Sequence, residues 1–231
     1  MNLKEHMKIR GGGIKSKGYK KTSRKNKIIS ILKEFIKNNI KEYFIITIIL
    51  LIGIFLGVMF INNSTHEQKM EISSYINTYM EAFEQTNSDS NFDLLQNNLR
   101  DNIILAIIMW FVGSTVVGIP IVFGIIVFRG FCLGYTISAI TMVLGVSKGI
   151  GFTAVSIIMQ NILFIPAIIS LGASSLKIYK SILNDKRREN IKLELIRHTV
   201  FCGLIALMLL LSAVVETEIS TNLLRAVIKY F

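Results

Sequence analysis

Residues 102–128 read NIILAIIMWFVGSTVVGIPIVFGIIVF, a run without a single charged side chain. This run opens a stretch of 83 residues, between Asp101 and Asp185, that contains no acidic side chain and four basic ones. Over the whole chain of 231 residues, 52% are hydrophobic and 18% are charged, and the mean hydropathy is +0.53. A water-soluble surface cannot be built from so apolar a composition. We therefore predict an integral membrane protein and exclude a soluble enzyme.

Outward from this run, five hydrophobic segments are candidates to cross the bilayer. The first has 19 residues, which gives a helix of about 28 Å against a hydrocarbon core of ~30 Å. The sequence thus predicts an all-α, polytopic membrane helix bundle with five transmembrane helices plus interfacial amphipathic helices. The five predicted spans are residues 43–61, 102–128, 131–147, 149–176 and 199–215.

The charged residues between these segments predict the orientation. The tail, residues 1–42, contains 13 of the 26 Lys and Arg residues, and the 177–198 loop contains seven bases against three acids. The 62–101 loop has the opposite balance, with two bases and seven acids. Because cytoplasmic loops are enriched in Lys and Arg, we place the N-terminal tail and the 177–198 loop in the cytoplasm. The acidic 62–101 loop and the C-terminal segment, residues 216–231, then lie outside the cell membrane.

The basic tail also bears on the partners of the protein. A net charge of +11 can indicate nucleic-acid binding, but these bases precede the first span. We therefore expect the tail to contact anionic lipid, and we expect no nucleic acid. Apolar residues between Ile28 and Ile40 recur at helical spacing. This pattern predicts an amphipathic helix that either lies in the membrane interface or extends the first span into water. We predict a second surface-lying helix at Ile219–Phe231.

The acidic 62–101 loop contains a further amphipathic pattern. Ser64 and Glu67 have the spacing of a capping box and predict where its helix begins. One interpretation lays the apolar face on the outer leaflet or on the ends of the spans. The other offers its aromatic residues to a partner protein, as aromatic side chains are enriched in interface cores. The apolar face comprises Ile72, Tyr75, Ile76, Tyr79, Met80 and Phe83, of which Tyr75, Tyr79 and Phe83 are the candidate partner-binding residues.

Two pairs of glycines in the spans have the GxxxG spacing that lets helix backbones approach closely. Gly53 and Gly57 form the first pair, and Gly130 and Gly134 form the second. We expect them to pack helices of one chain together, with a homo-oligomer as the alternative.

Prolines interrupt two of the long spans at Pro120 and Pro166. Pro166 leaves a backbone carbonyl one turn earlier without its helical donor, and Gln160 and Asn161 could satisfy freed backbone groups nearby. Broken helices with polar side chains can also line a transport site. A proton- or sodium-coupled carrier usually keeps an ionisable group at depth, yet no acid or histidine occurs in residues 102–184. We therefore favour a structural role for these residues.

Neither catalysis nor cofactor binding is indicated by the sequence. The three histidines, His6, His66 and His198, are far apart and have no metal-ligand spacing. Cys132 and Cys202 lie within hydrophobic segments and are interpreted as buried thiols rather than a disulfide. We expect no catalytic residue, no metal site and no cofactor, so the protein is predicted not to be an enzyme.

Three blocks of the sequence resemble the stage II sporulation protein M family. The first is Met109–Pro120, MWFVGSTVVGIP, and the second is Phe128–Thr136, FRGFCLGYT. The third is Gln160–Pro166, QNILFIP. With the basic N-terminus and the five predicted spans, the similarity covers nearly the whole chain.

The resemblance implies a role in endospore formation in a Gram-positive bacterium. Members of this family sit in the mother-cell membrane at the sporulation septum, where they act with stage II sporulation proteins D and P. Those partners degrade peptidoglycan so that the membrane can engulf the forespore, and the family member is understood as their membrane scaffold. The resemblance therefore favours the outer helix as an interaction surface. The alternative from the residues alone is a small transporter or channel component that uses the proline-broken spans.

Overall fold

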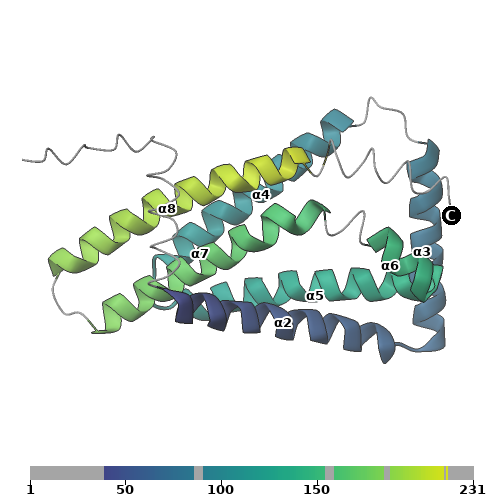
Figure 1. Cartoon of the computed structure of the whole chain (residues 1–231), viewed down its shortest axis with the longest axis horizontal. Helices are drawn as coiled ribbons and strands as arrows, with labels where there is room; N and C mark the ends of the chain where they lie inside the picture. The colour runs from purple at the N-terminus through teal and green to yellow at the C-terminus, as the bar shows by residue number, and fades with distance from the viewer. Residues whose placement is uncertain (1–38, 86–90, 154–158, 185–187, 216, 218–231) are drawn as a thin grey trace, which may run out of the picture. The chain divides into compact units, whose positions relative to one another are not determined.

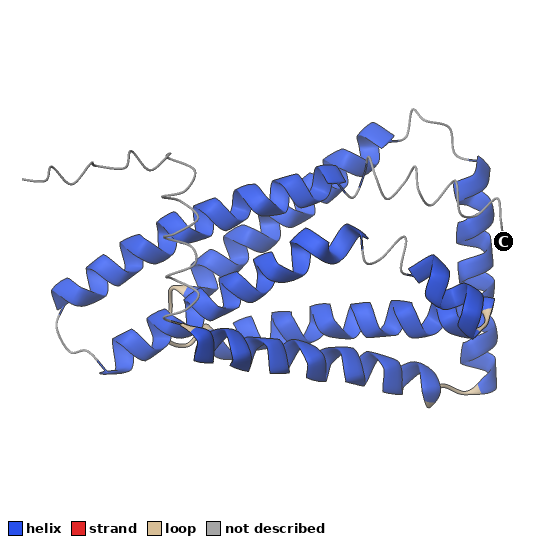
Figure 2. Cartoon of the chain, in the orientation of Figure 1, coloured by secondary structure: helices blue, strands red, loops and turns tan. Residues whose placement is uncertain are grey.

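A computed structural model describes residues 39–85, 91–153, 159–184, 188–215 and 217, and every regular element among them is a helix (Figures 1 and 2). The all-α prediction is confirmed for these residues. The predicted helices at Ile28–Ile40 and Ile219–Phe231 fall almost wholly outside the described residues. The elements are α2 (Ile40–Asn62), α3 (His66–Gln85), α4 (Asn91–Gly113), α5 (Ile119–Leu144), α6 (Val146–Thr153), α7 (Met159–Asn184) and α8 (Arg188–Val215).

Helices α2 and α5 lie side by side and run in the same direction (Figure 1). Gly53 of α2 packs on the backbone of Val127 and Gly130, whereas Gly57 packs further along on Phe131 and Gly134. Because the residue numbers rise together on both helices, the two are parallel. The chain between them therefore has to return from one end of the bundle to the other.

The remaining long helices alternate in direction. Helix α7 is antiparallel to α2, since Lys180 near its end pairs with Glu42 near the start of α2. Helix α8 is antiparallel to α7, because Ser174 lies next to His198 whereas Lys177, later on α7, lies next to Glu194, earlier on α8. Helix α4 is antiparallel to α8, because Asn102 bonds to Leu209 whereas Trp110, later on α4, bonds to Thr199, earlier on α8. Helices α2, α5 and α8 thus run one way, and α4 and α7 run the other.

This alternation defines two ends of the bundle. The end where α2 begins, which we call the inner end, also holds the α4–α5 turn at residues 114–118, the end of α7 and the start of α8. The opposite, outer end holds α3 and α6, where Ile76 of α3 packs near Ile140 and Phe152.

The prediction of a multi-pass membrane protein agrees with the length and apolarity of the helices. Apolar side chains such as Phe44, Leu51 and Phe55 of α2 are exposed on the bundle surface, where lipid would contact them. Helix α4 is as long as α2 but carries the charged residues Arg100 and Asp101 in its first half. Among the described residues, four helical segments are long and apolar enough to cross a membrane, namely Ile40–Asn62, Ile119–Leu144, Asn161–Leu183 and Ile191–Val215.

The helices divide the central hydrophobic stretch differently from the predicted spans 102–128 and 131–147. Helix α4 ends at Gly113, and α5 continues without interruption through Arg129 to Leu144. The break that we predicted at Arg129 is therefore wrong, and the true break lies at residues 114–118. Pro120 explains the position, because it lies in the first turn of α5, where its missing N–H would have no helical partner.

The predicted span 149–176 and the predicted loop 177–198 also change. Gly145 has φ +80°, a conformation open to glycine, and here the chain reverses so that Gly149 of α6 packs on Thr141 of α5. Helix α7 then begins at Met159 and continues to Asn184, well into the predicted loop. Helix α8 already begins at Arg188, so most of the predicted loop is helical.

Candidate functional site

The outer helix α3 is capped one residue later than predicted. The backbone N–H of Thr65 donates to Gln68 Oε1 at 2.9 Å, and the N–H of Gln68 donates to Thr65 Oγ1 at 3.4 Å. This reciprocal pair is a capping box. The predicted pair Ser64 and Glu67 is wrong, because the Ser64 hydroxyl donates back to the Phe60 carbonyl of α2.

The predicted apolar face of α3 divides between two directions. Ile76 is partly buried and packs against the Ile140–Phe152 cluster of α5 and α6. Tyr75 directly precedes Ile76, so it lies on a different side of the helix, and it is 72% exposed. For Tyr79 and Phe83, the structure describes the helical backbone only. Thus α3 is attached through Ile76 and presents Tyr75 outward.

Acidic residues share the exposed surface of α3 with Tyr75. Glu67, Glu71 and Glu81 are all exposed, as is Met70. Exposed apolar side chains and carboxylates on one helix are suited to a partner with basic and apolar groups.

The four GxxxG glycines lie together at the contact of α2 with α5, within one chain. A Cβ atom added at Gly53 would fall 3.1 Å from the Gly130 Cα atom, and one at Gly57 would fall 2.6 Å from the Tyr135 nitrogen. Cβ atoms added at Gly130 and Gly134 would meet the backbone of α2. Only glycine allows this close approach of two backbones.

The polar and proline residues of the spans do not form one group. Pro120 lies in the first turn of α5, and Pro166 lies inside α7. Asn161 is buried near the start of α7, and the Gln160 side chain lies outside the described residues.

A buried polar cluster that the sequence does not predict joins α4, α7 and α8. His198 of α8 is 2% exposed, and its Nδ1 atom lies 2.7 Å from the Ser174 hydroxyl of α7. The Cys202 sulfur lies 3.4 Å from His198 Nε2. Gly113 makes room for the cluster, because a Cβ atom added at this position would lie only 2.8 Å from the Ser175 Cβ atom.

The chemistry of this cluster is structural. A serine next to a histidine can form the first two members of a nucleophilic triad, but Ser174 is 3% exposed and a substrate could not reach it. The cluster instead hydrogen-bonds α7 to α8 in the membrane. Helical spacing within α8 places His198 and Cys202 on one face, but their partners on α4 and α7 depend on tertiary contacts.

Ion pairs tie the helices at the inner end. The Lys180 ammonium lies 2.8 Å from the Glu42 carboxylate, joining α7 to α2. The Glu194 carboxylate receives both Lys177 at 3.4 Å and Arg197 at 3.1 Å, joining α7 to α8.

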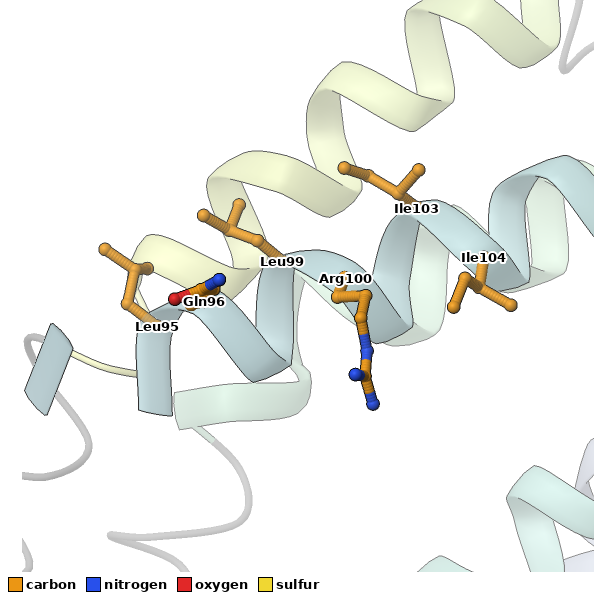
Figure 3. A pocket seen from close by; sticks show the side chains of 6 residues that line it. All are labelled: Leu95, Gln96, Leu99, Arg100, Ile103 and Ile104. Atoms are coloured by element: carbon orange, nitrogen blue, oxygen red, sulfur yellow. The ribbon is translucent and has the colours of Figure 1, made fainter. Parts of the chain in front are cut away.

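A shallow groove of about 380 Å³ follows one helix, α4, in its outer half (Figure 3). Figure 3 shows Leu95, Leu99 and Ile103 on one side of α4, with Arg100 and Ile104 on the other. Arg100 pairs with its neighbour Asp101 at 3.7 Å. Apart from Arg100 and Gln96, the side chains that line the groove are apolar.

With this geometry established, the comparison with known proteins decides the family. The sequence profile of a family described as Stage II sporulation protein M matches residues 46–221, about three quarters of the chain. The chain belongs to the stage II sporulation protein M family. The predicted resemblance is therefore confirmed. No curated protein and no solved structure matches the chain.

The three blocks that resemble this family occupy helix contacts in the bundle. Met109–Pro120 includes the end of α4, the turn and the start of α5. Phe128–Thr136 contains the two glycines that pack on α2. Gln160–Pro166 begins α7, and it meets the second block where the Arg129 guanidinium lies 5.1 Å from the Phe164 ring centroid.

The family assignment defines the general role of the chain, which is that of a multi-pass sporulation membrane protein. Among the described residues, no group of three or more His, Cys, Asp or Glu side chains could hold a metal ion.

Proposed function

We propose that this sporulation membrane protein is a scaffold without enzymatic activity that holds peptidoglycan hydrolases at the outer surface of the septal membrane during engulfment. The observation that carries the proposal is the position of α3. This helix is fixed to α5 and α6 by Ile76 and leaves Tyr75 and three carboxylates exposed at one end of the bundle. A cell-wall enzyme must be held on the outer side of the membrane, and α3 supplies a surface there.

We also infer that all five long helices cross the membrane. Helices α2 and α5 are parallel, so the intervening chain has to return across the bilayer, and α4 has the length for it at about 34 Å. The basic tail then lies in the cytoplasm, α3 lies outside and the C-terminus lies outside. Membership in the family supports a position on the mother-cell side of the septum as part of this proposal.

Cysteine labelling tests this orientation. A cysteine in place of Ser74 on α3 should react with a membrane-impermeant maleimide in whole cells, and one in place of Lys192 on α8 should react only after lysis. Reaction at position 192 in intact cells, with protection at position 74, would reverse the orientation and remove α3 from the outer surface.

The scaffold role is tested first by deletion. Sporulating cells that lack the protein should stop at the flat-septum stage in membrane-dye images, because the hydrolases are no longer concentrated at the septum. Normal engulfment in the deletion strain would contradict the proposed role.

The docking surface is then tested by co-purification with hydrolases resembling stage II sporulation proteins D and P. Tyr75→Ala removes the described exposed ring and should weaken recovery of the hydrolases, since buried aromatic anchors often contribute about 2 kcal/mol or more to an interface. Glu67→Gln, at the edge of the same helix, is the matched control and should do much less. Equal recovery with Tyr75→Ala and the native protein would place docking elsewhere.

The transport alternative gains no comparable support. Pro120 lies in the first turn of α5 and does not break a helix, and the structure does not bring it together with Pro166 and Asn161 in a described site.

A further inference from the structure

Helix α4 presents an exposed row of side chains on the surface of the bundle. Asn102, Leu105 and Met109 are buried on one side of this helix. The residues on the opposite side are exposed and follow one another at steps of four, three and four residues. This is the heptad spacing of helices that pair along a seam. The exposed residues, which we call the α4 stripe, are Arg100, Ile104, Ile107 and Phe111.

The α4 stripe carries two opposite charges next to each other. The Arg100 and Asp101 side chains are 70% and 62% exposed, and their closest charged atoms are 3.7 Å apart. Because a charge-assisted hydrogen bond measures about 2.7–2.9 Å, this pair leaves both groups with further capacity to bond. The next residue, Asn102, bonds to Leu209 within the membrane-spanning segment of α8. Charged side chains at such positions almost always pair or face protein.

The α4 stripe is complementary to itself. A two-fold axis along the membrane normal keeps two copies of the chain in the same orientation and places equivalent residues at the same depth. Asp101 directly follows a seam residue, and charged side chains at this flanking position pair with the other helix in parallel coiled coils. Arg100 of one copy then meets Asp101 of the second copy, and the symmetry produces this contact twice. The resulting group of two bases and two acids has no net charge.

We propose that the α4 stripe is a self-association surface, through which two copies of this chain form a parallel dimer in the membrane. Lipid acyl chains carry no group that could pair with Arg100 or Asp101, whereas a second copy supplies both charges. Arg100 and Ile104 also line the groove of Figure 3, which gives the second helix a recess to enter. The GxxxG glycines are a separate surface, since they are already used between α2 and α5 within one chain.

The dimer does not depend on hydrolase recruitment by α3, but it does require α4 to cross the membrane. The cysteine labelling described above tests this requirement separately. With α3 outside, position 192 lies inside only if α4 crosses as well as α5 and α7. Reaction at both positions 74 and 192 in whole cells would remove α4 from the membrane and overturn the proposal at that step.

Cross-linking of the full chain in native membranes tests the dimer itself. A cysteine in place of Ile104 should form a covalent dimer under mild oxidation, because seam residues face their counterparts across a two-fold axis. The matched control is a cysteine in place of Phe55, which is also exposed but lies on α2. The protein without an added cysteine gives the baseline for Cys132 and Cys202. A baseline yield at position 104, or equal yields at positions 104 and 55, would overturn the proposal and leave the stripe to lipid or to another protein.

Charge exchange then tests the pairing of Arg100 with Asp101. Arg100→Asp leaves only acids at these two positions and Asp101→Arg leaves only bases, so each variant alone should give roughly tenfold less of the dimer linked through Ile104→Cys. Co-expression of the two variants with different tags should restore the cross-link between them, because the acids of one copy meet the bases of the other. Arg197→Gln removes an exposed base from α8 and should leave the yield unchanged. A mixture that shows no recovery would confine the pair to one chain and overturn the proposal.

Discussion

Two groups of helices in this bundle are held together by different kinds of contact. Helices α2 and α5 meet through glycines, backbone against backbone. Helices α4, α7 and α8 meet through polar side chains, among them Asn102 bonded to the Leu209 carbonyl and Ser174 bonded to His198. Since lipid provides little hydrophobic drive for helices to associate, close packing and polar contacts are the two means available. Substitutions that add atoms at the glycine contact should lower the stability of the protein, whereas at the polar contact stability should fall when polar atoms are removed.

The largest effect is expected at the glycine contact. In Gly134→Leu, the new side chain would meet the backbone of Ile54 on α2, which has no room to move aside. We expect the free energy of unfolding in mixed detergent micelles to fall by about 3 kcal/mol, at the upper end for overpacked sites. Gly124→Leu is the control on the same helix, because it enters open space and should change stability by less than about 0.5 kcal/mol. Equal losses at both positions would show that α2 and α5 are not in close contact.

A smaller loss is expected where a glycine borders the polar cluster. In Gly113→Ala the new methyl group would press on the Ser175 side chain, so we expect about 1–2 kcal/mol of destabilisation. The double variant with Ser175→Gly should recover most of this loss, as measured by a double-mutant cycle. Independent, additive effects would separate Gly113 from the cluster.

Removing a polar contact should cost less than adding atoms at a glycine. Asn102→Leu removes the bond to the Leu209 carbonyl, and polar contacts between membrane helices average about 0.6 kcal/mol. Asn97→Leu, an exposed position of α4, is the comparison and should be nearly neutral in the same unfolding experiment. A loss at Asn102 as large as that at Gly134 would remove the distinction between the two contacts.

The smallest effect is expected at the ion pair that links the two regions. Glu42→Gln breaks the pair with Lys180, whose side chain is 41% exposed, so we expect about 0.5 kcal/mol or less. The difference from the native protein should shrink further as salt is raised, because salt screens exposed pairs. A difference that does not depend on salt would argue against a Coulombic origin.

Part of this structure follows from local sequence. Hydropathy adds up along a chain, so the acid-free stretch of residues 102–184 was sufficient to predict a membrane protein built of helices. The spacing of Gly53 with Gly57 and of Gly130 with Gly134 was sufficient to mark surfaces of close approach, because spacing on a helix is set by its geometry.

Other features depend on tertiary contacts and could not be predicted from the local sequence. The capping residue of α3 is Thr65 rather than Ser64, because the hydroxyl of Ser64 is already bonded to the end of α2. The division of the apolar face of α3 between Ile76 and Tyr75 follows from the position of α6, which folds back after Gly145.

The sequence by itself determined the membrane class, the helical architecture and the family of this protein, because composition, periodicity and family motifs are all properties of the chain alone. Tertiary structure alone decided that α5 runs through Arg129, since a single charge does not end a helix when neighbouring helices can accommodate it. It also decided that Gly113, Ser174 and His198 meet, although they are far apart in the sequence. Which residues of different helices touch depends on the parallel and antiparallel arrangement of the whole bundle, and no local pattern encodes that arrangement.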